Sequence, residues 1–454
     1  MAQTVLPKHR RSLTRRLAGL LLVLALCNSA CSSAADAPGA GNGTTAAPDS
    51  TAATGTTPDP GDDTPLHDPG GSGSSSRSSS GSSSGSNATP GVHDDRVVFG
   101  QSAAFSGPAR DLGEGMHLGI AAAFDEVNRA GGVHGRHLEL VSHDDAYEPE
   151  AAIDNTRQLI DSGDVFALIG AVGTPTSRSA LPVAAAADIP YIAPFTGAAF
   201  LRDARQSNVI NLRASYDQET EEMVQRLVSD LGIDRIGVMY QDDSFGRAGF
   251  NGVSAALDRR GTEAVAVGIY PRNTTAVKAG LLDLKQEDPE AVIVVGAYQP
   301  VAWLIRWAGE IGLDAVFVTI SFVGSNALAQ ELGPDGAGVL TTQVVPFPTD
   351  AGVAVVASYL DALAAHDPDA VAGFVSLEGY LAGRLAIAGL RSCGPTLDRG
   401  CFLERFASSE PIDVDGFMLR YGDQDNQGSD QVFWSMIDEN GEYRPLDAST
   451  EVPR

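Results

Sequence analysis

Three short stretches near the start of the globular region read RVVFG at residues 96–100, LELV at 138–141 and VFALIG at 165–170. Each is rich in β-branched and other apolar residues, and each has the length of a buried β-strand. The segment between the first two has apolar residues at helical spacing, namely Met116, Ile120, Phe124 and Val127. Strands that alternate with helices in this way predict parallel sheets covered by helices.

The same alternation continues for roughly 225 residues. Further strand-like runs occur at residues 235–240, 264–269, 291–295 and 316–319. Seven such strands exceed what one compact unit of this kind holds. We therefore predict an α/β fold with two lobes, each built on a parallel sheet.

The first 31 residues have the pattern of an export leader. Basic residues at positions 8, 10, 11, 15 and 16 precede the apolar run 17–26, which is too short to span a bilayer. Ser29-Ala30-Cys31 resembles the end of a lipobox, so we predict a lipidated Cys31 at the mature N-terminus. Ordinary signal-peptidase cleavage near residues 35–37 is the alternative, and the pair Arg15-Arg16 leaves twin-arginine export open.

Residues 32–95 consist largely of Ser, Gly, Pro, Thr and Asp, with almost no large apolar side chains. This composition is typical of a disordered tether. The expected organisation is therefore a leader (1–31), a tether (32–95), a globular body (96–446) and a short tail (447–454). A lipid at Cys31 would hold the body near a membrane.

The chain is acidic, with a formal net charge of -27 over 454 residues. Nucleic acids are excluded as partners, because binding phosphates needs clustered Lys and Arg that the body lacks. After the leader only Cys393 and Cys401 remain, and we predict that they form a disulfide in an oxidising compartment.

Catalytic and cofactor motifs are mostly absent from the sequence, and a match of residues 81–85 to the hydrolase pattern G-x-S-x-G lies in low-complexity sequence without a strand or helix beside it. There is no phosphate-binding G-x-x-x-x-G-K, no H-E-x-x-H, no C-x-x-C and no G-x-G-x-x-G that opens a helix. His134, His137 and His143 are close in sequence but lie on a turn and on both sides of a strand, so we interpret them as surface residues. We expect no enzyme activity, no metal and no cofactor.

Ligands bind to open α/β sheets at the carboxyl ends of the strands. Loops at such positions carry small residues that offer hydroxyls and backbone N–H groups, which favour an anion or an amide. We select Ser106, Thr174, Thr196, Gly197 and Ser321 from these loops, and the aromatic residues Phe245 and Tyr298 from two others. For Thr174, a purely structural role at the start of a helix, next to Pro175, is the alternative.

Taken together, these loops resemble those of the Leu/Ile/Val-binding family, the type I periplasmic solute-binding proteins. The resemblance runs from about residue 97 to 446. It rests on the order of several motifs: Phe105-Ser106-Gly107-Pro108, residues 128–135 (NRAGGVHG), Asp144-Asp145, Ile169-Gly170, residues 194–198 (PFTGA), Asp243-Ser244-Phe245-Gly246 and Tyr380.

The resemblance implies two Rossmann-like lobes that are joined by three crossovers and close on a solute. Lobe one would comprise residues 96–215 and 345–410, and lobe two residues 216–344 and 411–446. It also implies that Thr174 and Thr196 hold a carboxylate of the solute. The acidic residue that amino-acid binders use for the ammonium group matches Ser321 here, with Asp242 or Asp243 as the alternative position.

We therefore expect a binding protein that delivers a small carboxylate- or amide-bearing solute to an ABC permease outside the cytoplasm. An uncompensated ammonium group would be costly to bury, which argues against an ordinary amino acid. The alternative function is a sensory module that passes its closed state to a signalling receptor.

Overall fold

The computed structural model describes residues 89–446, which belong to one compact unit of the chain. The leader, Cys31, residues 32–88 of the expected tether and the tail 447–454 lie outside the described residues. Within residues 89–446, no helix combines the length and the apolar character that crossing a membrane requires.

The first sheet has five parallel strands in the order β2-β1-β3-β4-β5. Strand β1 is buried along nearly its whole length, in line with its run of apolar residues. The strands are β1 (Arg96–Ala103), β2 (His137–Asp144), β3 (Ala167–Ile169), β4 (Tyr191–Ile192) and β5 (Val209–Ile210).

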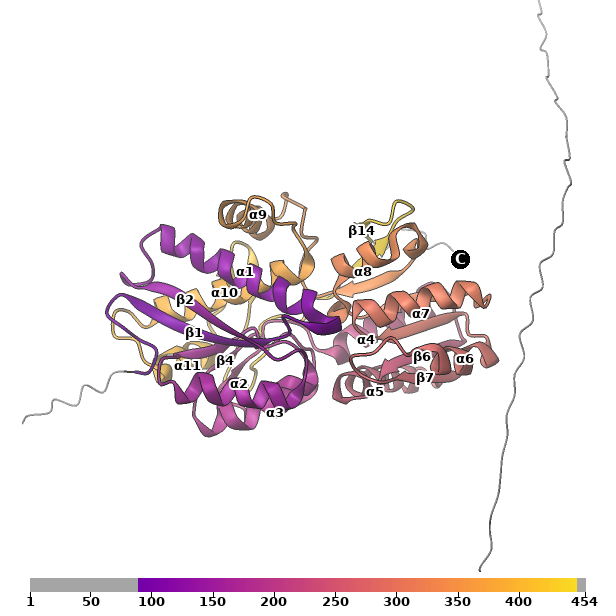
Figure 1. Ribbon diagram of the computed structural model, residues 1–454, viewed down its shortest axis with the longest axis horizontal. Coiled ribbons are helices and arrows are strands. Elements are labelled where there is room, and N and C mark those ends of the chain that lie inside the picture. Colours follow the sequence, from indigo (N-terminus) through magenta and orange to yellow (C-terminus); the bar gives the residue numbers. More distant parts are fainter. Residues whose placement is uncertain (1–88, 447–454) are drawn as a thin grey trace, which may run out of the picture. The chain divides into compact units, whose positions relative to one another are not determined.

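Helices cover both faces of this sheet: α1 packs with α10 on one face, and α2 packs with α3 on the other (Figure 1). Helices α1 and α10 approach each other closely through glycines. A Cβ atom on Gly119 would overlap the carbonyl oxygen of Ser376, so a larger residue there would force the helices apart. The helices are α1 (Arg110–Arg129), α2 (Pro149–Asp161), α3 (Thr174–Ala186), α9 (Ala354–His366), α10 (Phe374–Ser392) and α11 (Arg399–Ala407).

The second sheet has seven strands in the order β14-β13-β10-β9-β8-β6-β7. Strands β6 to β10 run parallel, and β13 and β14 extend the sheet in antiparallel pairing. The strands are β6 (Ile236–Gln241), β7 (Ala266–Tyr270), β8 (Ala291–Val295), β9 (Val316–Thr319), β10 (Leu340–Gln343), β13 (Phe433–Ile437) and β14 (Tyr443–Pro445).

The helices of this lobe follow the same two-sided plan. Helix α4 packs on α5, and α6 packs on α7 and against β7. A π-helical turn at Gln225–Asp230 continues α4. The helices are α4 (Tyr216–Val224), α5 (Ser244–Asp258), α6 (Lys278–Glu287), α7 (Tyr298–Glu310) and α8 (Ser325–Leu332).

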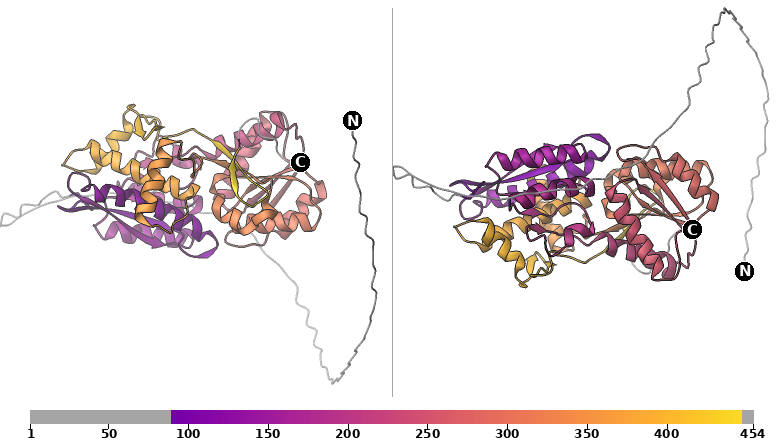
Figure 2. Two further views of the ribbon diagram at one scale, coloured as in Figure 1. Left: turned by 90° about the horizontal axis from the view of Figure 1, so that it is seen from above. Right: turned by 90° about the horizontal axis from the view of Figure 1, so that it is seen from below.

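The chain passes between the two sheets three times, at residues 211–215, 344–353 and 420–432. Helices α9 to α11 therefore return to lie beside the N-terminal elements, as the orange-to-yellow segments in Figure 2 show. Two of the crossovers touch where Asn211 forms a bridge with Gln427.

Two boundaries differ from the sequence-based expectation. Residues 89–95 were expected in the tether, but the carbonyl of Gly91 accepts from Val98 N at 2.9 Å and Val92 forms a bridge with Val97. The hairpin of β11 (Ile412–Val414) and β12 (Phe417–Leu419) was expected in lobe two, but it packs on α10 of lobe one. Its four apolar residues Ile412, Val414, Phe417 and Leu419 are buried there, which accounts for the position. The crossover into lobe two accordingly begins after Leu419.

The predicted α/β fold with parallel sheets is confirmed, and all seven predicted strands are present with ends shifted by a few residues at most. Tyr191-Ile192, whose following loop supplied Thr196, is strand β4, whereas sequence analysis missed the two-residue strand β5 and the strands from β10 onward. The Cα atoms of Cys393 and Cys401 lie 5.8 Å apart, at the end of α10 and in α11.

Candidate functional site

The two lobes meet around a cluster of aromatic rings. Phe322, in the loop after β9, has its ring centroid 4.5 Å from that of Phe245, which lies in α5 of the same lobe. From lobe one, the rings of Phe195 and Tyr147 lie 5.3 Å and 6.0 Å from Phe322. All four side chains are buried. These loops follow β2, β4, β6 and β9, so the carboxyl ends of strands in both sheets face one another here.

Two threonine hydroxyls lie beside these rings. Thr174 Oγ1 and Thr196 Oγ1 are 2.6 Å apart, and both residues are fully buried. Thr174 is the first residue of α3, which is preceded by Gly173 with φ 104°, a conformation that favours glycine. Gly197 follows Thr196, and a Cβ atom there would press on Tyr216. The backbone therefore carries both hydroxyls close to the Tyr216 ring.

The hydroxyls of Tyr147 and Tyr216 are buried and have no hydrogen-bond partner within residues 89–446. Burial raises the pKa of Tyr147 well above its ordinary value, and the charge of Asp243 adds to the effect. Burial also raises the pKa of Tyr216, although Arg213 and the hydroxyls of Thr196 and Thr174 oppose the shift. Buried hydroxyls without partners are rare in folded proteins and point to a binding site.

We call these residues the interlobe joint: Tyr147, Thr174, Phe195, Thr196, Tyr216, Phe245 and Phe322. The joint draws on both lobes, and its Tyr216 directly follows the first crossover.

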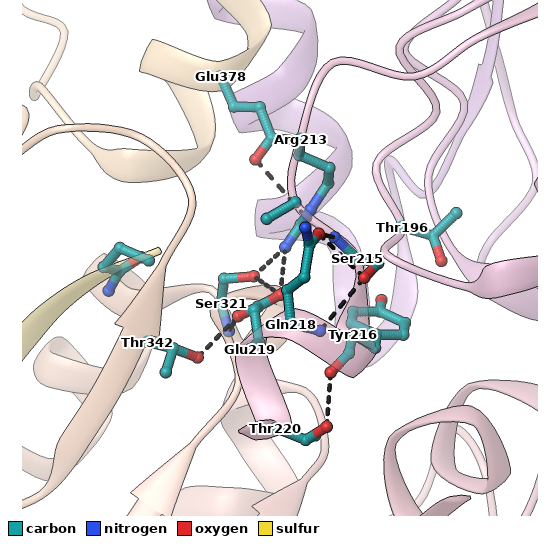
Figure 3. Close-up of polar contacts among 12 residues, drawn as sticks. Thr196, Arg213, Ser215, Tyr216, Gln218, Glu219, Thr220, Ser321, Thr342 and Glu378 are labelled. Carbon is teal, nitrogen blue, oxygen red and sulfur yellow. Dashed lines mark hydrogen bonds and ion pairs between the residues drawn. The ribbon is translucent and has the colours of Figure 1, made fainter. Parts of the chain in front are cut away.

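Beside the joint, a buried charge cluster surrounds Arg213 in the first crossover (Figure 3). Arg213 Nη2 lies 3.1 Å from Glu219 Oε1 and also contacts Ser321 Oγ, while Arg213 Nη1 lies 3.6 Å from Glu378 Oε2. Glu219 is in α4, Ser321 follows β9, and Glu378 is in α10 of lobe one. With Thr342 of β10, these residues form what we call the Arg213 cluster.

Glu219 is the centre of this cluster. It accepts hydrogen bonds from Ser321 Oγ at 2.9 Å, Ser321 N at 3.0 Å and Thr342 Oγ1 at 2.7 Å, in addition to Arg213. On the opposite side of Arg213, burial raises the pKa of Glu378 to about 7 despite the attraction of the guanidinium.

A second set of polar contacts joins the lobes at the surface. Glu148, at the start of α2, accepts from Arg272 Nη2 and Asn273 Nδ2, both at 2.6 Å. Asn273 Nδ2 also donates to the carbonyl of Ala146 at 3.2 Å. Ala146, Tyr147 and Asn273 all have positive φ (49°, 62° and 55°), a conformation that costs energy in non-glycine residues. We call Ala146, Glu148, Arg272 and Asn273 the rim contact.

Five of the seven predicted site residues gather at or beside the joint: Thr174, Thr196, Gly197, Phe245 and Ser321. Tyr298 is buried at the start of α7 and lines a neighbouring cleft of about 630 Å³ between the lobes, together with Gly107 and Asp111 of lobe one. Ser106 is exposed on the loop in which Phe105 N donates to Asp144.

Sequence reasoning missed Tyr147, Arg213, Tyr216 and Phe322 as site residues. Tyr147 is two residues after the motif Asp144-Asp145, which follows a predicted strand, and Phe322 lies next to Ser321, so both positions carried a usable signal. Arg213 lies in the first crossover and Tyr216 is the first residue of α4, so no strand end marked them. Within the described residues, no group of three or more His, Cys, Asp or Glu side chains is arranged to hold a metal ion.

The sequence is similar to known solute-binding proteins. A sequence profile of the family described as "Periplasmic binding protein" matches residues 96–442. An "Amino acid binding protein" of Pseudomonas aeruginosa is 25% identical over 237 residues, which are 52% of this chain and 63% of that protein. The chain thus matches less than two thirds of that relative's length. A Leu/Ile/Val-binding protein of Rhizobium johnstonii is 26% identical over 320 residues, 68% of this chain and 82% of that protein.

A solved structure extends the match over the described body. The crystal structure of a possible leucine/isoleucine/valine-binding protein from Rhodopirellula baltica is 38% identical in sequence, with a TM-score of 0.74. The similarity covers 80% of this chain and 98% of that one.

Proposed function

The chain belongs to the periplasmic binding protein family, in its Leu/Ile/Val-binding branch, and from this membership we propose that it delivers a small carboxylate- or amide-bearing solute to an ABC importer. Proteins of this family bind solutes outside the cytoplasm and are not enzymes. The proposed partner is an ABC permease complex in the membrane.

The observation that carries the proposal is the pair of buried tyrosine hydroxyls without hydrogen-bond partners, Tyr147 on lobe one and Tyr216 at the start of α4. Groups of this kind are costly to bury alone, and a bound solute would satisfy them. The neighbouring hydroxyls of Thr174 and Thr196 and the backbone at Gly197 would add donors to the same solute. Ser321 and Phe245 would complete the site from lobe two.

Closure of the two lobes is the proposed mode of capture. The rim contact and the rings of the joint hold the lobes together in the described structure, and three crossovers provide the hinge. Hinge closure of this type is an established motion of periplasmic binding proteins. Tyr298, beside Asp111 of the opposite lobe, is proposed to seal one side of the cleft.

We further propose that residues 1–31 are an export leader, that Cys31 carries a lipid, and that Cys393 and Cys401 form a disulfide. Cys31→Ala should then move the protein from the membrane fraction to the soluble fraction without altering its far-ultraviolet circular dichroism. Unchanged membrane fractionation of the variant would rule out the anchor.

Native mass spectrometry of protein purified from its own host tests the proposed function. We expect one retained small molecule per chain, and deletion of the gene should abolish uptake of that molecule by the host. Uptake that is unchanged in the deletion strain would contradict the importer role. A protein without any retained solute, and with no thermal stabilisation by small carboxylates or amides, would contradict solute binding itself.

A further inference from the structure

The carboxylate of Glu219, beside the joint, has no capacity left for a solute. An ionised carboxylate offers about four lone-pair positions. Glu219 receives four donors: Arg213 Nη2 at 3.1 Å, Ser321 Oγ at 2.9 Å, Ser321 N at 3.0 Å and Thr342 Oγ1 at 2.7 Å. Glu219 is fully buried, so no water competes for these positions. An ammonium group in the joint would therefore find this acid already neutralised.

The other buried acids near the joint are also engaged. Asp243 caps α5 by accepting from Phe245 N at 2.9 Å and Gly246 N at 3.1 Å, and it accepts from Gln241 Nε2 at 2.6 Å. Asp145 accepts from Ser102 Oγ at 2.8 Å and from Tyr147 N at 2.9 Å. Glu378 lies on the lobe-one side of Arg213 and is paired with it.

The buried polar atoms that do lack hydrogen-bond partners at the joint can all donate, and the two tyrosine hydroxyls among them can also accept. Within the described residues they include Nε and Nη1 of Arg213 and the hydroxyls of Tyr147 and Tyr216. Arg213 Nη1 has only the 3.6 Å ion pair with Glu378. The guanidinium lies over the rings of Phe195 and Tyr216, at 5.0 Å and 5.9 Å from their centroids, and so borders the joint.

Around these donors the surfaces are apolar. Phe195, Phe245 and Phe322 contribute rings from both lobes. A solute that fits these surroundings has an anionic or strongly accepting group for the donors and an apolar body for the rings.

We infer that the solute is a carboxylate with an apolar body and without an ammonium group. This inference rests on the proposed function and narrows the chemical class of the solute. An α-amino acid would bury a cation beside a Glu219 carboxylate whose acceptor positions are filled and beside acids that already bind other groups, whereas the matching 2-oxo acid or unsubstituted acid would not. The donors of the joint would serve the carboxylate, and the oxo group where present.

The test uses pairs of compounds that differ only at the α-carbon. Calorimetry with solute-free protein, prepared by unfolding and refolding, compares leucine with 4-methyl-2-oxopentanoate and phenylalanine with phenylpyruvate. We expect the oxo acid of at least one pair to bind at least tenfold more tightly than its amino acid. Equal or tighter binding of the amino acids would overturn the inference and leave the proposed function standing.

Two variants test whether the unpartnered hydroxyls face the solute. Tyr147→Phe and Tyr216→Phe each remove a buried hydroxyl that makes no hydrogen bond of good geometry with the protein, so we expect at least fivefold weaker binding of the oxo acid with little change in the melting temperature. The matched control is Tyr191→Phe, because Tyr191 OH donates to Ser177 Oγ at 3.2 Å. It should lower the melting temperature and leave the affinity unchanged.

The solute retained from the host gives a second readout if neither pair binds. A retained carboxylate without an amine supports the inference, and a retained amine-bearing solute overturns it. Unchanged affinity in both tyrosine variants would also overturn it. Absence of any retained solute, with no binding by either pair, would contradict the proposed function together with the inference.

Discussion

The Arg213 cluster and the rim contact both use an arginine and a glutamate to join segments of the two lobes, but the first pair is buried and the second is partly exposed to solvent. Arg213 and Glu219 are 1% and 0% exposed, whereas Arg272 and Glu148 are 25% and 43% exposed. Removing one partner of a buried pair leaves a charge without compensation, which is strongly destabilising. A partly exposed pair is screened by water and contributes little to stability. The two regions therefore have different tasks.

The Arg213 cluster maintains the fold at the hinge. Its residues come from the first crossover, α4, α10, β10 and the loop after β9, so it fixes the start of lobe two relative to the crossover. The rim contact lies at the surface between Glu148 of lobe one and Arg272 and Asn273 of lobe two. These residues must separate when the lobes open, so the rim contact affects the balance between open and closed states more than it affects folding.

The largest expected effect is that of Glu219→Ala. It leaves Arg213 buried without its nearest partner, so we expect a loss of about 3–5 kcal/mol in the free energy of unfolding. Urea unfolding measures this loss. The control is Asp242→Ala, which breaks the exposed pair with Arg247 inside lobe two and should cost at most about 1 kcal/mol. Equal losses in both variants would remove the distinction between buried and exposed pairs.

The buried Glu378 should also make the stability of the protein depend on pH. Its pKa is raised by burial from 4.5 to about 7, so below pH 4.5 it is protonated in both folded and unfolded states and imposes no penalty. As the pH rises from 4.5 toward 7, Glu378 ionises in the unfolded state but stays protonated in the folded state. Ionisation therefore stabilises the unfolded state, and the free energy of unfolding decreases. The stability of wild type relative to Glu378→Gln should therefore fall between pH 4.5 and 7. Parallel pH profiles would contradict a raised pKa.

At the rim we expect the smallest effect on folding. Glu148→Gln removes the charge that pairs with Arg272, so the free energy of unfolding should change by less than about 0.5 kcal/mol. Solute affinity should fall by about two- to fivefold, because the closed state loses a contact that the open state lacks. Calorimetry measures the affinity, with Asp154→Asn, within α2, as the control that should change neither quantity. Unchanged affinity in Glu148→Gln would mean that the rim contact plays no part in closure.

The sequence predicted most of the parallel strands and three of the seven joint residues, Thr174, Thr196 and Phe245. Parallel strands are short apolar runs, and the loops at their carboxyl ends, with Thr174, Thr196 and Phe245, lie at the same edge for topological reasons. The local sequence pattern was therefore enough to predict these strands and loops.

The Arg213 cluster could not be predicted in this way. Arg213 and Ser321 are 108 positions apart, and Glu219 and Thr342 are 123 apart, so no local pattern links them. The hairpin β11–β12 was assigned to the wrong lobe for a related reason, since its burial depends on contact with α10 and not on its own sequence. The sequence also suggested that Ser321 replaces the acidic residue that amino-acid binders use for the ammonium group. That expectation was incomplete, because Ser321 Oγ donates to the carboxylate of Glu219.

Solution X-ray scattering on the solute-free and solute-saturated protein tests the central claim that the two lobes close around a solute at the joint. We predict that the radius of gyration decreases when the identified solute is added. Glu148→Gln should reach the same compact state only at a higher solute concentration. Identical scattering curves with and without solute, in protein that calorimetry shows to be saturated, would contradict the account.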